Sequence, residues 1–356
     1  MHEDPFPCRT PWPALGTSGA DKVGTRSQPG RRDAAMAQEL RPPLTAGLAV
    51  RTRISPVGVW SSLGVAALAL QVWVFGRWLL FSDLRSAPPS GYRISGGRTA
   101  AVWTLQIVVT ATVLSIGVVL LRRCLRERTV TFDAALYVGL LLSMWQDPIM
   151  YWNKLYVVYN QHLPNVETWG PYIPGWHGPD TGGEPIYESV AGGSGLAYPI
   201  VMVWFWLQYK LYRQIALRRP HWSNWRLFLT AAGIGTLIDL PLEPLFLFSG
   251  VFAYPVGYPP VTLFAGHWYQ LPLLEVLSAS LVLVTPILVL RRIDESRPVP
   301  WLFTTSGRTS APARPSVRLL AGVGLANVVI LAYLLANVAI AELGGPFPSD
   351  MPTWLW

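Results

Sequence analysis

Seven apolar stretches follow one another from residue 57 to the end of the chain. They cover residues 57–80, 99–121, 131–152, 196–217, 227–252, 266–290 and 318–341. Each is close to the about 20 residues that a helix needs to cross a bilayer. The first, second, sixth and seventh are plain spans, whereas the third, fourth and fifth carry more polar residues. The pattern predicts an all-α integral membrane protein, a bundle of about seven transmembrane helices.

Residues 1–56 differ from the rest because they are polar, rich in Pro, Gly and Arg, and lack an apolar run. A segment of this kind cannot bury enough apolar surface to fold. We therefore expect a disordered tail over 1–56 and a polytopic membrane domain over 57–356. No secretory signal peptide is expected, because the tail has no hydrophobic core region.

The overall composition agrees with the membrane class. Hydrophobic residues make up 51% of the chain and charged residues 13%, whereas soluble proteins average about 25% charged. The only cysteines are Cys8 and Cys124, which argues against a disulfide framework and against a cysteine metal site. The net charge of +8 is spread over a few loops without the aromatic-plus-basic pattern of a nucleic-acid module, so no nucleic-acid partner is predicted.

Basic residues alternate between loops, and this alternation predicts the orientation. The arginine-rich loops are 122–130, 210–226 and 291–317. Loops 153–195 and 253–265, which lie between them, hold one lysine in total. Positive loops remain in the cytoplasm, so we predict a multi-pass cell-membrane protein with a cytoplasmic N-terminus. The large excess of arginine over lysine is typical of a GC-rich bacterial genome, so we also predict a bacterial source. Loop 81–98 disagrees, since it holds three arginines yet should face outward.

Acidic residues inside the apolar stretches are the strongest sign of chemistry. They are Asp147, Asp239, Glu243 and Glu275. A charged group in hydrocarbon costs a few kcal/mol or more, so such residues mark functional sites by default. Counted along their helices, all four fall in the outer half of an apolar layer about 30 Å thick. We expect them to surround one cavity.

Asp239 and Glu243 are four residues apart, so they share one helix face. Pro241 and Pro244 should interrupt that helix, which membranes tolerate where a helix lines a cavity. Two carboxyl groups close together in a dry place leave one protonated acid beside one carboxylate. This is the equipment of general acid–base catalysis. Alternatively, the acids only hydrogen-bond Tyr, Trp or the backbone groups that the prolines free.

The predicted outer loop 145–180 is dense in aromatic and polar residues. Asp147–Pro148 should end the third helix, because a residue before proline avoids the helical region. The aromatic side chains could form a lid above the acids, or merely an interfacial belt. The candidate substrate-binding residues are Trp145, Asn153, Asn160, His162, Trp169, Tyr172, Trp176, His177 and His267. His162, His177 and Asp180 lack a tight ligand spacing, so neither a metal nor another cofactor is predicted.

These motifs resemble the membrane spirocyclases of the AveC type. The resemblance rests on Trp145-Gln146-Asp147-Pro148, on Ile173-Pro174-Gly175-Trp176, and on the pair Asp239 and Glu243 beside prolines, with Asn153, Asn160 and Trp169 between them. It extends from about residue 57 to the end. Members act on avermectin- and milbemycin-like macrolides of actinomycetes, and some also dehydrate the product beside the spiro carbon.

The resemblance implies a spiroketal cyclase that converts a dihydroxy-ketone polyketide macrolide into a 6,6-spiroketal with loss of water. Two carboxyl groups suit this reaction, because glycosidases handle the same kind of oxocarbenium ion with such a pair. The expected partners are the macrolide and the lipid bilayer, with no obligate protein partner.

Two other classes of function remain open. A proton-coupled transporter or exporter would use the same acids as a relay, although no internal repeat is evident and the acids lie in one half of the layer. A purely structural membrane subunit is the third possibility.

Overall fold

The computed structural model describes residues 55–86, 94–190, 194–295, 297, 299–305 and 313–355. All of them belong to one unit, Thr52–Trp356. The predicted tail 1–56 therefore lies almost wholly outside the described residues. Helices make up 66% of the structure, which confirms the all-α class.

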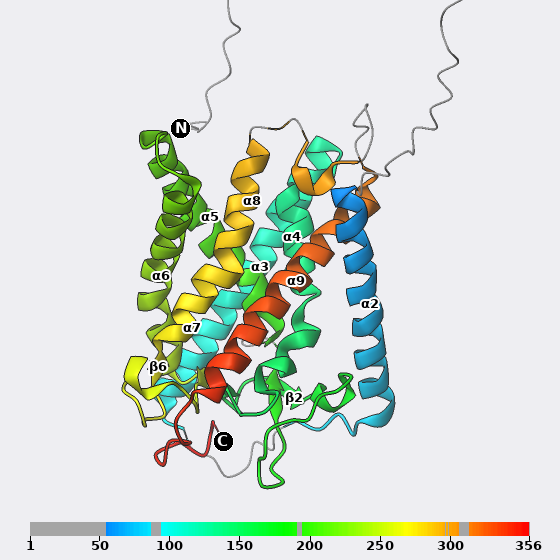
Figure 1. Ribbon diagram of the computed structural model, residues 1–356. Helices are drawn as coiled ribbons and strands as arrows, with labels where there is room; N and C mark the ends of the chain where they lie inside the picture. The colour runs from blue at the N-terminus through cyan, green and yellow to red at the C-terminus, as the bar shows by residue number, and fades with distance from the viewer. Residues whose placement is uncertain are drawn as a thin grey trace, which may run out of the picture. The chain divides into compact units, whose positions relative to one another are not determined.

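The helices of the bundle run up and down in alternation, with α7 and α8 in the same direction (Figure 1). They are α2 (Pro56–Phe81), α3 (Gly96–Glu127), α4 (Phe132–Leu141), α5 (Ser194–Arg218), α6 (Asn224–Ser249), α7 (Leu273–Ser278), α8 (Thr285–Glu295) and α9 (Pro315–Glu342). A π-helical turn, η4 (Ala279–Val284), joins α7 to α8, so that the three form one continuous rod.

Five described helices are long and apolar enough to cross a membrane. They are α2, α3, α6, the α7–α8 rod over Leu273–Arg292, and α9. Helix α4 is apolar but has only 10 residues. Helix α5 has 25 residues, and Lys210 and Arg213 interrupt its apolar character. The five apolar helices support the prediction that this is a membrane protein. The total of seven spans stays a prediction.

Helix starts follow from local capping. Ser55, Ser95 and Ser223 precede α2, α3 and α6, and each side chain accepts a hydrogen bond from the backbone N–H three residues later. This satisfies a donor that the first turn leaves without an intrahelical partner. At the other end of α6, Gly250 adopts φ 82°, a left-handed conformation that glycine reaches without a steric penalty.

Helix α9 packs closely against both α2 and α4 through glycines (Figure 1). A Cβ atom on Gly64 would lie 2.0 Å from the carbonyl oxygen of Leu320, and one on Gly324 would lie 2.0 Å from that of Trp60. Small residues let helix backbones approach in a membrane, where packing rather than the hydrophobic effect holds helices together.

The third apolar stretch departs from the predicted single helix. Helix α4 ends at Leu141, and Asp147 and Pro148 lie inside a following 3₁₀ segment, η1 (Met144–Tyr151), rather than at a helix end. Pro148 has no N–H to donate to the carbonyl oxygen of residue 144, which disfavours a regular α-helix over this segment. The prediction that Asp147–Pro148 ends a helix was therefore wrong by six residues.

The fifth and sixth stretches also differ from expectation. Pro241 and Pro244 do not interrupt α6, which runs through both of them. The sixth helix begins at Leu273 and not at 266, because β5 (Thr262–Leu263) pairs with β6 (Leu271–Pro272) before it. Prolines are accommodated within membrane helices when neighbouring groups satisfy the freed carbonyls.

Short strands and turns connect the helices at the end of the bundle where α6 and α9 finish (Figure 1). Strand β1 (Val158–Tyr159) pairs with β4 (Phe252–Ala253), and β2 (Asn165–Glu167) pairs with β3 (Tyr187–Ser189). The single turns at this end are η2 (Gly170–Tyr172) and η3 (Pro259–Val261), whereas η5 (Trp301–Phe303) lies at the other end, between α8 and α9 (Figure 1). The β1–β4 pair fixes the loop after η1 beside the segment after α6.

Candidate active site

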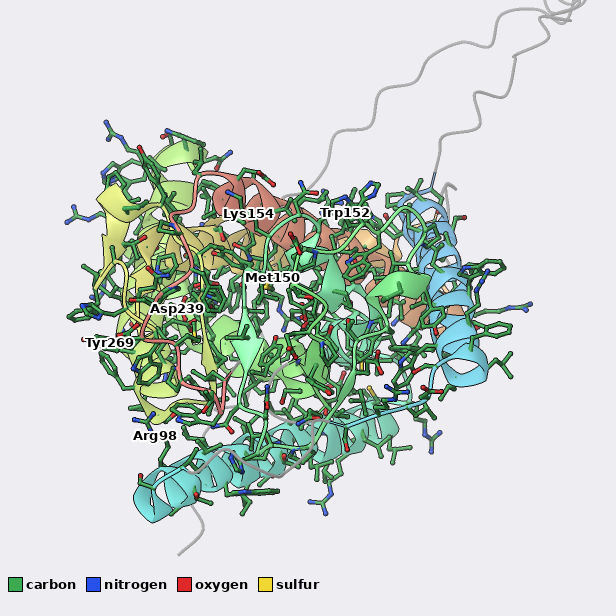
Figure 2. All side chains as sticks on the ribbon, turned by 90° about the horizontal axis from the view of Figure 1, so that it is seen from below. Arg98, Met150, Trp152, Lys154, Asp239 and Tyr269 are labelled. Carbon is green, nitrogen blue, oxygen red and sulfur yellow. The ribbon has the colours of Figure 1, made fainter. Side chains whose placement is uncertain are left out.

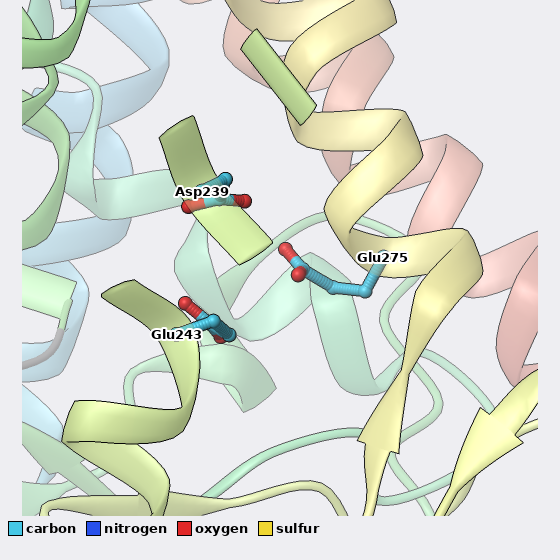
Figure 3. Close-up of side chains that lie close together, drawn as sticks. All are labelled: Asp239, Glu243 and Glu275. Atoms are coloured by element: carbon cyan, nitrogen blue, oxygen red, sulfur yellow. The ribbon is translucent and has the colours of Figure 1, made fainter. Parts of the chain in front are cut away.

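Three of the four predicted acids meet at one point. Asp239 and Glu243 of α6 and Glu275 of α7 each offer a carboxyl oxygen, and these oxygens lie within 4.8 Å of one another. Figure 3 shows the three side chains turned toward each other across the two helices. Asp239 and Glu275 are only 7% and 3% exposed, and Glu243 is half-buried. We call these three residues the carboxyl triad.

Local structure explains why the triad forms. Asp239 and Glu243 are one turn apart on α6, so both project from the same side of that helix. Glu275 lies in the first turn of α7, directly after the β5–β6 hairpin. The following π-helical turn packs on α6, where Ser280 donates a hydrogen bond of 2.6 Å to the carbonyl oxygen of Ala232. Contacts of this kind hold the two helices in register.

Tyrosine hydroxyls orient two of the triad's carboxyl groups. Tyr254, from the segment after β4, donates a hydrogen bond of 2.6 Å to Glu243 Oε1. Tyr333 of α9 donates one of 2.6 Å to Glu275 Oε1. Burial, and then the neighbouring carboxyl group of Glu243, raise the pKa of Tyr254 well above its usual value. Its hydroxyl therefore stays protonated and acts as a donor.

A third tyrosine, Tyr156, reaches the triad from the loop after η1. The β1–β4 pairing places its ring 5.4 Å from that of Tyr254. The side chain is fully buried. Burial raises the pKa of Tyr156 well above its usual value, and the charges of Glu275 and Glu243 raise it further.

Within the described part of the chain, no ion pair reaches the triad. Three ionised carboxyl groups in an apolar layer would be very unfavourable, so they must share protons or hold a cation. Carboxyl oxygens are the ligands that Mg²⁺ and Ca²⁺ prefer, and these three side chains could hold such an ion. As proton carriers, they can act as general acid and general base.

Asp147 does not join the triad. Its carboxyl group accepts hydrogen bonds of 2.5 Å from Tyr198 and 3.1 Å from Tyr159. Tyr151 lies between Asp147 and the fully buried Glu188, to which its hydroxyl donates at 2.5 Å. The expectation of four acids around one cavity therefore fails for Asp147, because η1 turns its side chain toward this second cluster.

The tryptophans of the outer loop pack around η1. Trp169 donates a hydrogen bond of 2.8 Å to the carbonyl oxygen of Trp145, and Trp176 donates one of 3.0 Å to that of Pro148. Trp169 also contacts the ring of Phe75 on α2, with centroids 5.2 Å apart. In Figure 2, Trp152 lies toward α2 and well away from Asp239. These contacts differ from the expected lid over the acids.

The other predicted binding residues have structural partners. Trp145 donates to Asn327 at 3.0 Å, and the buried Asn160 donates to the carbonyl oxygen of Gly250 at 2.7 Å. The Asn153 side chain donates a hydrogen bond to Glu342, and the backbone N–H of His162 donates one to the Asn160 side chain. The ring of His177 contacts that of Trp152, and His267 forms a hydrogen bond with Asp350. The half-buried Tyr172 packs against the hydrophobic core. None of these contacts places the residue in the triad.

Residues 127–354 match the family described as spirocyclase AveC-like. The chain belongs to this family. The match includes α4 to α9 and begins well after residue 57, so it is narrower than the motifs suggested. No curated protein and no solved structure matches the chain.

The AveC-like match contains every carboxyl group described above. It also contains three site residues that the acidic pattern did not identify: Tyr156, Tyr254 and Tyr333. A signal existed for Tyr333, since it lies four residues before Asn337 in the otherwise apolar last helix. Tyr156 and Tyr254 reach the site only through the β1–β4 pairing, which the sequence pattern did not predict.

Proposed function

We propose that this AveC-like spirocyclase closes a 6,6-spiroketal on a dihydroxy-ketone polyketide macrolide in an actinomycete membrane. The observation that carries the proposal is the carboxyl triad, buried, held by tyrosines and without an ion pair in the described chain. Spiroketal closure needs a proton donor and a proton acceptor at one carbon, which is what grouped carboxyl groups supply.

The reaction proceeds by proton transfer and net loss of one water. One substrate hydroxyl adds to the ketone and gives a hemiketal. A protonated carboxyl group then protonates the hemiketal hydroxyl, which leaves as water, and an oxocarbenium ion remains. A neighbouring carboxylate stabilises this cation, as in glycosidases, and accepts the proton of the second hydroxyl as that oxygen closes the second ring.

We assign the acid and base roles to Asp239 and Glu243, with Glu275 as the third member. The tyrosine bond to Glu243 favours its charged form, because a donor hydrogen bond stabilises a carboxylate. Asp239 has no such donor among the described residues, and Glu243 repels a second negative charge beside it. Asp239 is therefore the proposed acid and Glu243 the proposed base.

The route of entry fits an apolar substrate. Leu237, Leu242 and Leu245 on α6 are 72%, 46% and 55% exposed, so the helix that carries Asp239 and Glu243 faces the lipid. We propose that the macrolide reaches the triad from the bilayer. A proton-coupled transporter has no support from the family match.

The test incubates membranes that contain the protein with a nine-carbon chain that has a central ketone and a hydroxyl at each end. Loss of water to the 6,6-spiroketal is followed by mass spectrometry, and a methyl-branched version allows the epimers to be separated. Boiled membranes give the uncatalysed rate. A rate that equals this control would contradict the proposal.

A second experiment dialyses the membranes against EDTA and then adds Mg²⁺. Catalysis by proton transfer alone should survive the dialysis. Catalysis that needs a bound cation should be lost and should return with Mg²⁺.

A further inference from the structure

Three buried polar atoms at and near the Glu275 carboxyl group of the triad have no hydrogen-bond partner in the described chain. They are the Tyr156 hydroxyl oxygen, Asn337 Nδ2 and Glu275 Oε2. Tyr156 and Asn337 are fully buried, and Glu275 is nearly so. Buried polar groups in native proteins almost always have a partner, because an unmade bond costs the desolvation of the group. Such a set indicates the place of a ligand.

The three atoms come from different elements that meet at Glu275. Tyr333 of α9 bonds Glu275, and Asn337 lies one helical turn further along the same face. Ser278, one turn after Glu275 on α7, donates a hydrogen bond of 3.1 Å to Asn337 Oδ1. This bond occupies the amide oxygen and leaves the amide NH₂ group as the free part of Asn337. Tyr156 approaches from the loop after η1, beside Tyr254.

The chemistry of the free atoms selects a neutral ligand. The Tyr156 hydroxyl and the Asn337 amide are donors, and Glu275 Oε2 accepts a hydrogen bond, or donates one when the carboxyl group is protonated. Two donors suit a carbonyl oxygen, and the carboxyl oxygen suits a hydroxyl next to it. An anionic group would be repelled by the three acids.

We propose that Tyr156, Asn337 and Glu275 form the subsite that binds the ketone oxygen of the substrate and the hydroxyl that adds to this ketone. This inference rests on the proposed function, because the ketone that the subsite binds is the ketone of the proposed spirocyclase substrate. A bound ketone oxygen would accept from Tyr156 and Asn337, which polarises the carbonyl before the hydroxyl adds. It also holds the hemiketal hydroxyl within reach of the acids.

The probe for the ketone part of the subsite, formed by Tyr156 and Asn337, is the same nine-carbon ketone with both hydroxyls capped as methyl ethers, which cannot cyclise. Its affinity for the detergent-solubilised protein is measured by titration. Tyr156→Phe should weaken binding about tenfold, because one ligand hydrogen bond is lost. The ligand-free variant should melt at the same temperature or higher, because it no longer buries an unpaired hydroxyl.

Tyr137→Phe is the matched control. The Tyr137 hydroxyl is also buried, but it donates at 2.8 Å to the carbonyl oxygen of Val113. This variant should melt at a lower temperature and bind the probe normally. If Tyr156→Phe binds the probe as tightly as the wild type, or if the wild type does not bind it at millimolar concentration, the subsite is wrong.

A second pair of variants tests the amide independently of Tyr156. Ser278→Ala removes the bonds from Ser278 to Asn337 Oδ1 and to the carbonyl oxygen of Glu275, but it keeps the free amide N–H groups of Asn337. Asn337→Leu removes the bond to Ser278 and those amide N–H groups. Asn337→Leu should lose several-fold more affinity than Ser278→Ala. Equal affinities would overturn the role of Asn337.

The failure of the subsite and the failure of the proposed function have different signatures. If Asp239→Asn and Glu243→Gln strongly lower turnover while Tyr156→Phe binds normally, the subsite fails and the acid–base proposal stands. If Tyr156→Phe loses affinity while both acid variants keep full turnover, the subsite stands and the acid–base assignment fails.

Discussion

At the scale of single residues, the two groups of buried acids differ in how well their oxygens are satisfied. Asp147 accepts hydrogen bonds from Tyr151, Tyr159 and Tyr198. Glu188 accepts them from Tyr151 and Thr168. In the triad, Glu275 Oε2 has no partner in the described chain. A satisfied buried carboxylate stabilises a fold, whereas an unsatisfied one retains capacity for a ligand or a proton.

The first prediction concerns the acid–base pair. Asp239→Asn and Glu243→Gln are nearly isosteric, so the protein should still reach the membrane. Each should lower the rate of spiroketal formation about 10²–10⁴-fold, the usual contribution of a positioned acid or base. Because such ketones can also cyclise slowly unaided, the remaining product should be a mixture of spiro epimers. Chiral chromatography of the product measures both effects.

An acid variant that keeps the full rate and a single epimer would move catalysis away from this pair. Glu275→Gln is then the next variant to test, since Glu275 is the remaining member of the triad.

The second prediction concerns Asp147, the acid outside the triad. Asp147→Asn weakens the charge-assisted bonds from Tyr198 and Tyr159, so it should lower the free energy of unfolding by about 1–3 kcal/mol. The epimer ratio should not change. Thermal unfolding in detergent, together with product analysis, checks both statements. Loss of epimer selectivity at normal stability would instead place Asp147 in the reaction.

At the scale of elements, the close approach of α2 to α9 depends on glycine. The backbones are so near that even a methyl group on Gly64 or Gly324 would overlap a carbonyl oxygen of the facing helix. The contact is far from the triad and belongs to the scaffold. It holds α2, which lies outside the family match, to α9, which lies within it.

The third prediction tests this contact. Gly64→Ala should lower the free energy of unfolding by about 1–3 kcal/mol, because the helices must separate to accept the methyl group. Gly76→Ala is the matched control on the same helix, since nothing lies within 4 Å of its added Cβ atom. It should be neutral or slightly stabilising, because alanine favours helix over glycine. Equal melting temperatures for the two variants would contradict the close packing.

At the scale of the whole molecule, charge and candidate chemistry lie at opposite ends of the helices. Arg123 and Arg291 flank the buried Asp133 at distances of 3.5 and 2.9 Å, near the end of α3 and the end of α8. The triad lies toward the other ends of α6 and of the α7–α8 rod (Figures 1 and 3). The positive-inside rule predicts that the arginine end faces the cytoplasm and that the triad faces outward.

The fourth prediction concerns this orientation. Glu184 precedes α5 and His221 follows it, so the two exposed residues lie at opposite ends of that helix. In a protein whose Cys8 and Cys124 are replaced by serine, Glu184→Cys should react with a membrane-impermeant maleimide on intact cells. His221→Cys should react only after permeabilisation. The reverse pattern would place the triad on the cytoplasmic side.

The sequence by itself determined the properties that depend on local pattern. Long apolar runs predicted the helices of the bundle to within a few residues for α2, α5, α6 and α9. Acids inside such runs predicted that Asp239, Glu243 and Glu275 carry the polar site, because a buried charge in an apolar helix needs a reason. The spacing of four residues placed Asp239 and Glu243 on one face, as the structure confirms.

Only the tertiary structure decided which of these groups meet. Asp147 appeared equivalent to the other acids, but the 3₁₀ segment η1 directs it to Tyr198 and Tyr159. Tyr156 and Tyr254 join the site because β1 pairs with β4, which begins 94 residues later in the chain. In this pairing Val158 lies opposite Ala253 and Tyr159 lies opposite Phe252. Contacts at such separation depend on how loops cross between helices, and neither helical periodicity nor apolar run length carries that information.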